Sequence, residues 1–269
     1  MNPIDDLFGR LRTAKKKAFI PFITAGDPSP AATTELIRDL DSAGCHLIEV
    51  GFPFSDPIAD GPVIQASYTR ALDRGLKVDD IFKCVDAARP VAAPLVGMVS
   101  YTLVHRRGPA DFVQRAKQAG FAGVIVPDLP AEEAESFAKI CASADFCNIL
   151  LVTPTTPPER ADKIVKLSTG FLYCVSVTGI TGERDKLPDE LLTQLRRLRS
   201  QTDLPLCVGF GVSKPEHVRM LRAEADGVIV GSAIVRRLEK AATANWPAVR
   251  NEIRDLVKPL IEALNPTDR

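Results

Sequence analysis

The 269-residue chain has little of several features that mark particular classes of protein. Its 34 basic residues are balanced by 34 acidic ones, which argues against a general nucleic-acid binder and against attachment to a membrane by a basic patch. No apolar stretch approaches the roughly 18 residues that cross a bilayer, and the N-terminus lacks the apolar core of a signal peptide. We therefore expect a protein of the cytoplasm, or of an organelle stroma after processing.

Metal and redox patterns are also absent. The six cysteines form no Cys-x-x-Cys pair, so neither a zinc ribbon nor a thioredoxin-like site is indicated, and we expect all six to be reduced and structural. The three histidines, His46, His105 and His217, lie at the start of a strand, after another strand and within a helix. Because they do not share a face, no metal site is predicted.

A regular alternation of apolar and amphipathic segments fills the chain. Eight short runs are continuously apolar, as in strands covered on both faces. They cover residues 18–23, 46–51, 94–99, 122–127, 146–152, 171–177, 205–210 and 227–232. Helical spacing is found at residues 31–44, 110–120, 131–144, 159–168, 189–200, 215–225 and 232–242.

The number of these units and the chain length predict the fold class α/β, a single (β/α)8 TIM barrel over residues 1–269. A short N-terminal helix and a C-terminal helix around 247–264 would be additions to it. An open, doubly wound sheet is the alternative, but it does not require eight regular repeats. In a barrel of this kind the chemistry lies where the strands end, so those positions hold the candidate residues.

The segment after the second strand, LIEVGFPFSDPIADGPVIQ (47–65), is the most unusual of them. Glu49 lies in an otherwise apolar strand, where a carboxylate is costly unless it is paired, hydrated or functional. The loop that follows adds Asp56 and Asp60 among three prolines, which restrict its backbone. Two converging carboxylates can serve proton transfer, one as shuttle and one holding a substrate N–H. A salt-bridged core glutamate and turn-forming aspartates are the structural alternatives.

Glycine-rich turns follow the last three strands. GITGERDK (179–186), GFGVS (209–213) and VGSAIV (230–235) offer backbone N–H groups without bulky side chains, and the last leads into a helix. This arrangement is typical of phosphate sites in barrels, although a single such turn would be ordinary turn chemistry. Apolar residues near strand ends would line the space between acids and phosphate, unless they are barrel core. They are Phe22, Tyr101, Ile125, Tyr173 and Phe210.

These motifs resemble the tryptophan synthase α-subunit family. The resemblance covers essentially the whole chain and is carried, in order, by GDPSP (26–30), IEVGFPFSDPIADGPVIQ (48–65), VTGITG (177–182), GFGVS (209–213) and DGVIVGSAIV (226–235). It implies a carbon–carbon lyase of tryptophan biosynthesis. The implied reaction is the reversible cleavage of indole-3-glycerol phosphate to indole and glyceraldehyde 3-phosphate.

The resemblance also implies roles for single residues. Glu49 would act as a mobile proton shuttle, and Asp60 would hold the indole N–H. Tyr173 matches a tyrosine near the catalytic glutamate, and Phe22, Tyr101, Ile125 and Phe210 would surround the indole. The positions that match the phosphate site are Gly182, Gly211, Gly231 and Ser232.

The loop 177–190 would close over the substrate, with Thr181 contacting Asp56 or Asp60. A mobile loop without a catalytic role is the alternative. Val177 departs from some relatives, which have a basic residue there, so a charge contact near the phosphate would be missing.

No cofactor is implied for this chain, and none of the eight apolar runs contains the lysine that a Schiff-base aldolase needs. The family's α subunit passes indole to a β subunit that holds pyridoxal phosphate, in an αββα complex. Segments 53–60 and 127–133 match regions that face this partner. Two alternatives remain: a stand-alone indole-3-glycerol-phosphate lyase releasing free indole, and an activating partner with weak turnover of its own. Another phosphate-binding barrel isomerase would lack the SDPIADGP loop.

Overall fold

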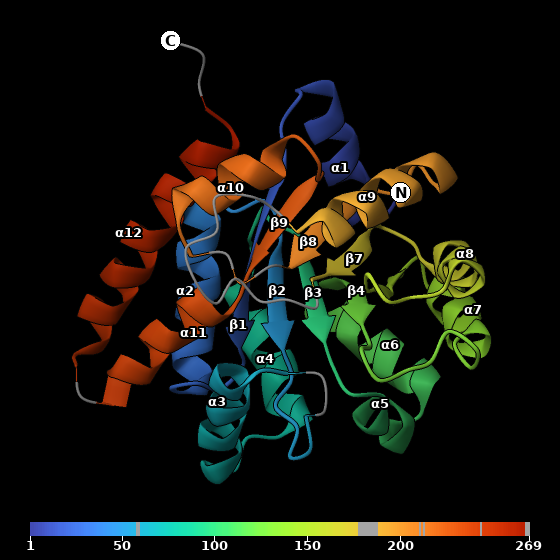
Figure 1. Ribbon diagram of the computed structural model, residues 1–269. Helices are drawn as coiled ribbons and strands as arrows, with labels where there is room; N and C mark the ends of the chain where they lie inside the picture. The colour runs from blue at the N-terminus through green and yellow to red at the C-terminus, as the bar shows by residue number, and fades with distance from the viewer. Residues whose placement is uncertain (58–59, 177–187, 210, 212, 243, 267–269) are drawn as a thin grey trace.

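The centre of the molecule is a parallel β-sheet that curves into a nearly closed barrel (Figure 1). The computed structural model describes residues 1–57, 60–176, 188–209, 211, 213–242 and 244–266. The strands are β1 (Ala18–Thr24), β2 (Ile48–Gly51), β3 (Leu95–Met98), β4 (Phe121–Ile125), β5 (Cys147–Ile149), β6 (Leu151–Val152), β7 (Leu172–Val175), β8 (Leu206–Gly209) and β9 (Gly227–Val230). Their spatial order, β5-β4-β3-β2-β1-β9-β8-β7-β6, confirms the predicted barrel.

The predicted run 146–152 forms two strands rather than one. β5 pairs with β4, and β6 pairs with β7, so this run joins the two ends of the sheet order. The residue between them, Leu150, accepts a hydrogen bond from the N–H of Tyr173 at 3.1 Å. The barrel therefore closes through one run whose two halves face different neighbours.

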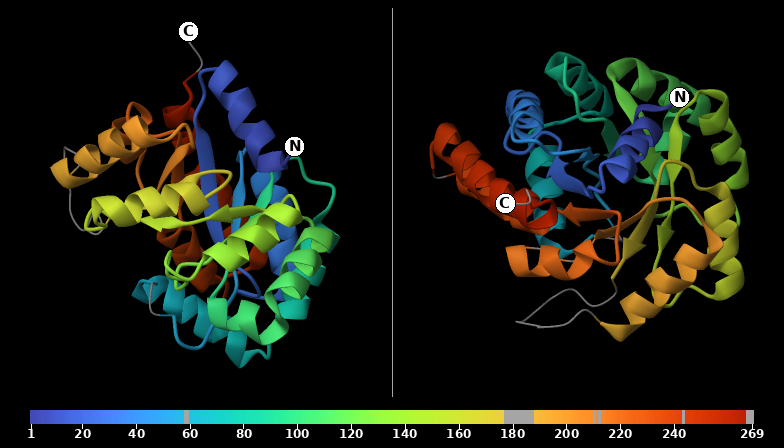
Figure 2. Two further views of the ribbon diagram at one scale, coloured as in Figure 1. Left: turned by 90° about the vertical axis from the view of Figure 1, so that its right-hand side faces the viewer. Right: turned by 90° about the horizontal axis from the view of Figure 1, so that it is seen from above.

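Helices surround the barrel, most of them as an outer ring (Figure 2). They are α1 (Pro3–Thr13), α2 (Pro30–Ser42), α3 (Pro62–Asp73), α4 (Val78–Ala88), α5 (Tyr101–Arg107), α6 (Pro109–Ala119), α7 (Glu135–Ser143), α8 (Pro158–Leu167), α9 (Asp189–Gln201), α10 (Pro215–Arg222), α11 (Ser232–Glu239) and α12 (Trp246–Leu264). All the predicted helical segments are confirmed, although α7 begins four residues later than expected. Three helices, α3, α4 and α5, were not predicted. The apolar stripe of α4, with Ile81, Phe82 and Val85 buried, would have been sufficient to predict it.

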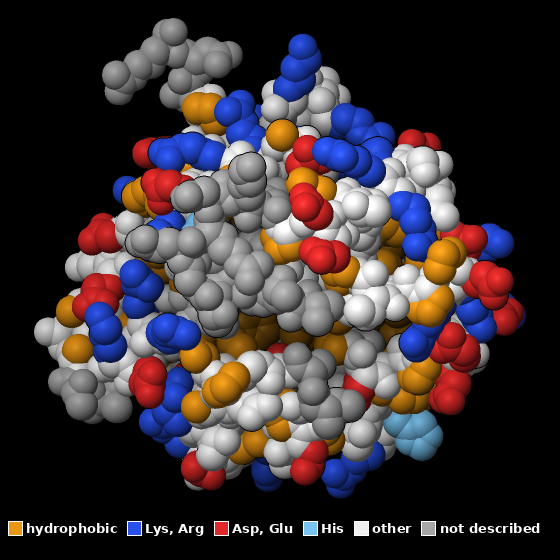
Figure 3. Space-filling view, in the orientation of Figure 1, with side chains coloured by type: hydrophobic (Ala, Val, Ile, Leu, Met, Phe, Trp, Pro, Cys, Tyr) orange, Lys and Arg blue, Asp and Glu red, His pale blue; other side chains and the backbone are white. Residues whose placement is uncertain are grey.

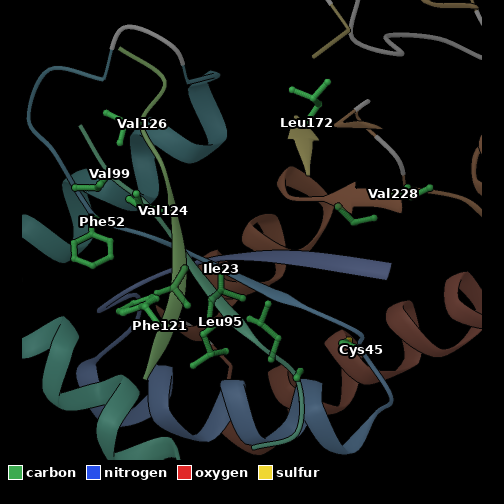
Figure 4. Packing of buried hydrophobic residues seen from close by; sticks show 14 of the residues in the cluster. Ile23, Cys45, Phe52, Leu95, Val99, Phe121, Val124, Val126, Leu172 and Val228 are labelled. Carbon is green, nitrogen blue, oxygen red and sulfur yellow. The ribbon is translucent and has the colours of Figure 1, made fainter. Parts of the chain in front are cut away.

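Two layers of hydrophobic side chains hold the sheet in place. The outer layer fills the space between strands and helices, where Ile23, Phe52, Leu95 and Phe121 pack together (Figure 4). The inner layer lies within the barrel and includes Ile20, Leu47, Val96 and Ile125. Because successive strand residues point to opposite faces, continuous apolar runs supply both layers at once.

Helix α1 closes the N-terminal end of the barrel. Asn2 caps it by accepting a hydrogen bond from the N–H of Ile4, and its amide nitrogen donates to the carbonyl of Ala122 at 2.8 Å. Phe8 packs against Phe171 of the inner layer, with ring centroids 5.8 Å apart. With one end closed in this way, the open end of the barrel is the one where the strands terminate.

The six cysteines are free thiols and all are buried, as predicted. Within the described part of the chain, no helix is long and apolar enough to span a membrane.

Replacing the residue that seals the barrel should destabilise the fold without changing the open end. Phe8→Ala removes a side chain that is only 6% exposed, and we expect a loss of about 3 kcal/mol in the free energy of unfolding, measured by urea denaturation. The exposed Arg10→Ala on the same helix is the matched control. A loss for Phe8→Ala no larger than that control would show that α1 does not support the barrel.

Candidate active site

Glu49 is placed inside the barrel by the register of its strand. In β2 it lies between Phe22 of β1 and Val96 of β3. The residue is fully buried, and neither carboxyl oxygen has a hydrogen-bond partner among the residues that the structure describes. Among the described residues, no ion pair of the kind expected for a salt-bridged core glutamate is formed by Glu49. A buried polar group without partners is costly, and sites that persist at such a cost are typically functional.

Asp60 reaches the same region from the loop after β2. This loop ends where Gly61 and Pro62 start α3, and proline is favoured at such a first helical position. Gln65 of α3 donates to the carbonyl oxygens of Asp60 at 2.7 Å and of Pro57 at 3.3 Å. The first turn of the helix thus fixes the end of the loop that carries Asp60.

A cavity of about 170 Å³ at the open end of the barrel brings most of the predicted residues together. Glu49 and Asp60 line it with the predicted residues Phe22, Tyr173, Gly211, Gly231 and Ser232. On this face of the molecule, Figure 3 shows a hollow floored by hydrophobic side chains.

Five other predicted positions are not among these lining residues. Tyr101 begins α5 and packs against His105 and Phe137, with ring centroids 6.1 and 6.0 Å away. Ile125 belongs to the inner layer of the barrel. Outside the described residues lie Thr181, Gly182 and Phe210, as does Val177.

Several lining residues were missed by sequence reasoning. They contribute apolar surface or backbone around the cavity and are Ile64, Met98, Pro127, Leu151, Val175, Gly209 and Ile229. Met98, Val175 and Gly209 are the last residues of β3, β7 and β8. A uniform survey of every strand end would have found these three, because the barrel directs all strand ends to one opening.

The two carboxyl groups ionise at different pH. Burial, and then the negative charge of Asp60, raise the pKa of Glu49 to about 8. Burial raises the pKa of Asp60 to about 6. Near neutral pH the pair therefore holds one proton, which is on Glu49, while Asp60 is ionised. Glu49 can then act as an acid, and Asp60 can stabilise a positive charge.

Backbone forms another part of the cavity lining, at Gly211, Gly231 and Ser232. Helix α11 starts at Ser232 directly after Gly231, and no described side chain caps its first N–H groups. Gly211 has a φ of +50°, a conformation that other residues adopt at a cost. Uncapped N–H groups at a helix N-terminus attract anions, so this part of the lining can hold a phosphate.

These features define a class: a (β/α)8-barrel enzyme whose open end holds a pair of carboxyl groups and an uncapped helix N-terminus in one cavity. Residues 8–263 match the family described as tryptophan synthase alpha chain. The chain belongs to this family.

Individual relatives agree over almost the full length. The tryptophan synthase alpha chain of Rhodopirellula baltica is 51% identical, covering 98% of this chain and 99% of the relative. That of Methanothermobacter thermautotrophicus is 46% identical, covering 83% and 84%. The crystal structure of tryptophan synthase subunit alpha from Legionella pneumophila superimposes with a TM-score of 0.90 at 34% identity, covering 99% and 100%.

The burial of Glu49 should make stability depend on pH. Its pKa is about 8 in the folded chain and near 4.5 when exposed, so between these values the folded state binds more protons and stability falls as pH rises. Glu49→Gln removes this titration. We expect the variant to gain on the order of a few kcal/mol relative to the parent between pH 5 and pH 8.5, measured by urea denaturation. With the exposed Glu133→Gln as control, a difference that is the same at all pH values would contradict the burial of an ionisable Glu49.

Proposed function

We propose that this chain cleaves indole-3-glycerol phosphate to indole and glyceraldehyde 3-phosphate, its family's reaction, in the cavity that Glu49 and Asp60 line. The observation that carries the proposal is the fully buried carboxyl of Glu49, which has no partner among the described residues and lines one cavity with a second carboxyl of lower pKa. Such a pair fits acid–base chemistry on the substrate itself. Because the described lining residues include neither lysine nor arginine, no Schiff-base step is invoked.

Glu49 would act first as an acid and then as a base. Its proton goes to C3 of the indole ring, which makes the ring a cationic leaving group. The resulting carboxylate then takes the proton of the hydroxyl on the side-chain carbon attached to C3. The bond between that carbon and C3 breaks, its electrons return to the ring, and an aldehyde forms. Glu49 is protonated again at the end, so the step is balanced.

Asp60 would accept the indole N–H. When C3 is protonated, positive charge develops at the ring nitrogen, and an ionised carboxylate in a site of low dielectric stabilises it. The pKa of Asp60, about 6, keeps it ionised at neutral pH, whereas that of Glu49, about 8, keeps the acid protonated.

The rest of the cavity would hold the ring and the phosphate. The ring would lie against Phe22 and Tyr173, while the phosphate would accept hydrogen bonds from backbone near Gly211, Gly231 and Ser232. Thr181 and Gly182 would complete the site from the loop that follows β7.

A β subunit with pyridoxal phosphate is the proposed partner, in a cytoplasmic αββα complex. Segments 53–60 and 127–133 would face this partner, and described residues of both line the same space. Phe54, Asp56 and Pro57 of the first segment line one small cavity with Pro127 and Asp128 of the second. A single surface next to the active-site opening suits a partner that receives indole directly.

Two substitutions test the roles of the acids. Glu49→Gln should lower kcat by at least about 100-fold, because the amide can neither donate nor take up the proton. Asp60→Asn should lower kcat/KM by about 100-fold through loss of the charge opposite the ring nitrogen. Steady-state release of indole is the measurement, and binding of indole-propanol phosphate should persist in Glu49→Gln. Near-normal turnover of Glu49→Gln would refute its role.

Dependence on the partner distinguishes a subunit from a stand-alone lyase. We expect cleavage to rise at least tenfold when a tryptophan synthase β subunit is added. Turnover that is already high alone, with no stimulation, would identify an independent indole-3-glycerol-phosphate lyase.

A crystal soaked with indole-propanol phosphate should place the phosphate at residues 182, 211, 231 and 232 and the ring nitrogen near Asp60.

A further inference from the structure

Tyr68, on α3, is a buried side chain beside the active site to which neither the sequence analysis nor the proposed mechanism assigns a role. It is 3% exposed and packs with Phe22, Ile64 and Val235. Two of these neighbours, Phe22 and Ile64, also line the catalytic cavity.

On both sides of Tyr68, the helix that carries it is fixed to β1 or to the segment that follows this strand. The hydroxyls of Ser67 and Thr24 lie 2.6 Å apart. Arg70 donates two hydrogen bonds to the buried carboxylate of Asp27, at 3.1 and 2.6 Å. Tyr68 therefore has little freedom to move away from the barrel.

The hydroxyl of Tyr68 lies against the backbone of β2. It is 2.9 Å from where a Cβ would lie on Gly51, two residues after Glu49, so only glycine leaves it this room. It makes no hydrogen bond to any described residue, and it is not among the fully enclosed unpartnered atoms. Largely buried tyrosine hydroxyls usually have a hydrogen-bond partner. We therefore expect this hydroxyl to bind a group in the adjoining space.

That space is a second cavity, which Tyr68 and Asp60 both line. It adjoins the catalytic cavity, because Asp60, Met98 and Pro127 line both. Its volume is about 30 Å³, which is room for one or two water molecules between polar groups.

Among the described residues that line the two cavities with Asp60, the titratable side chains other than tyrosines are all acidic. They are Glu49 from β2, Asp56 from the same loop, and Asp128 from the loop after β4; Tyr173 of β7 faces it as a neutral phenol. The described residues that line the two cavities include no lysine or arginine. Because no described cation lies beside it, the negative charge of an ionised Asp60 must be stabilised by hydrogen-bond donors.

Other donors in the small cavity are already engaged. Asp128 accepts hydrogen bonds from the hydroxyl of Ser100 at 2.6 Å and from the N–H of Tyr101 at 2.8 Å. Among the described residues that line this cavity with Asp60, Tyr68 is thus the side-chain donor that remains unengaged.

We propose that Tyr68 is a positioning residue for Asp60. Its hydroxyl donates a hydrogen bond to a water molecule in the small cavity, and this water donates to the Asp60 carboxylate. The contact keeps Asp60 ionised and oriented toward the substrate N–H. Burial and the negative charges of Asp60 and Glu49 raise the pKa of Tyr68 well above its usual value, so the phenol keeps its proton to donate. The inference rests on the proposed function of Asp60.

The direct test is the titration of Asp60 in the substrate-free chain. In protein labelled with [13C]aspartate, the carboxyl resonance that is missing from Asp60→Asn identifies this residue. Removing a donor to the charged form raises a carboxyl pKa. Tyr68→Phe should therefore move the titration midpoint upward by half a unit to one unit, whereas Tyr101→Phe, whose ring packs outside the cavity, should leave it unchanged.

Activity provides the second measurement. In the parent chain kcat/KM should rise with an apparent pKa near 6 as Asp60 ionises. Tyr68→Phe should shift this acidic limb upward by the same amount, lowering kcat/KM about three- to tenfold below the midpoint and less than twofold at pH 8. A structural role alone would lower it equally at every pH.

The outcomes separate the two proposals. An unchanged Asp60 midpoint in Tyr68→Phe would refute the role of Tyr68, whatever the activity. A shifted midpoint in a chain that cleaves no indole-3-glycerol phosphate would support the contact and refute the proposed function. A shift in both measurements supports both.

Discussion

The constraint on which the rest of this structure depends is the desolvation of one carboxyl group, that of Glu49. Glu49 is fully buried in β2 without a hydrogen-bond partner in the described part of the chain, and the fold bears a cost that a hydrophobic residue would remove. The same burial raises its pKa to about 8, which makes a glutamate an acid at neutral pH. Stability and chemistry are therefore opposed at this position, as in other sites where a carboxyl is kept protonated by its surroundings.

The rest of the barrel supplies enough stability to offset the cost of burying Glu49. An outer hydrophobic layer and an inner layer sealed by α1 provide a scaffold whose open end tolerates polar groups. Rigid attachments then place the second carboxyl: Gln65 fixes the end of its loop, and Arg70 and Asp27 tie α3 to β1. Two neighbouring carboxyl groups have different pKa values only when the surrounding structure holds each carboxyl group in a different environment.

Local pattern was enough to predict the repeating units, because strand and helix periods are properties of the chain itself. It failed where an element depends on its neighbours. The run 146–152 reads as one strand, yet its halves pair with β4 and β7, since closing a barrel brings different partners to each half. Tyr101 was expected to contact substrate because it follows a strand, but α5 begins at that residue and turns its ring toward Phe137.

The sequence by itself determined the class of fold, the family and the two acids, because an acid in an apolar strand and a long motif are visible without coordinates. Only the tertiary structure decided which side chains meet at the open end. It brought Glu49 and Asp60 into one cavity, left Ile125 in the barrel core, and set Tyr68 beside Asp60. Burial, and with it the pKa of each carboxyl, comes from atoms distant in the chain, so no local pattern contains it.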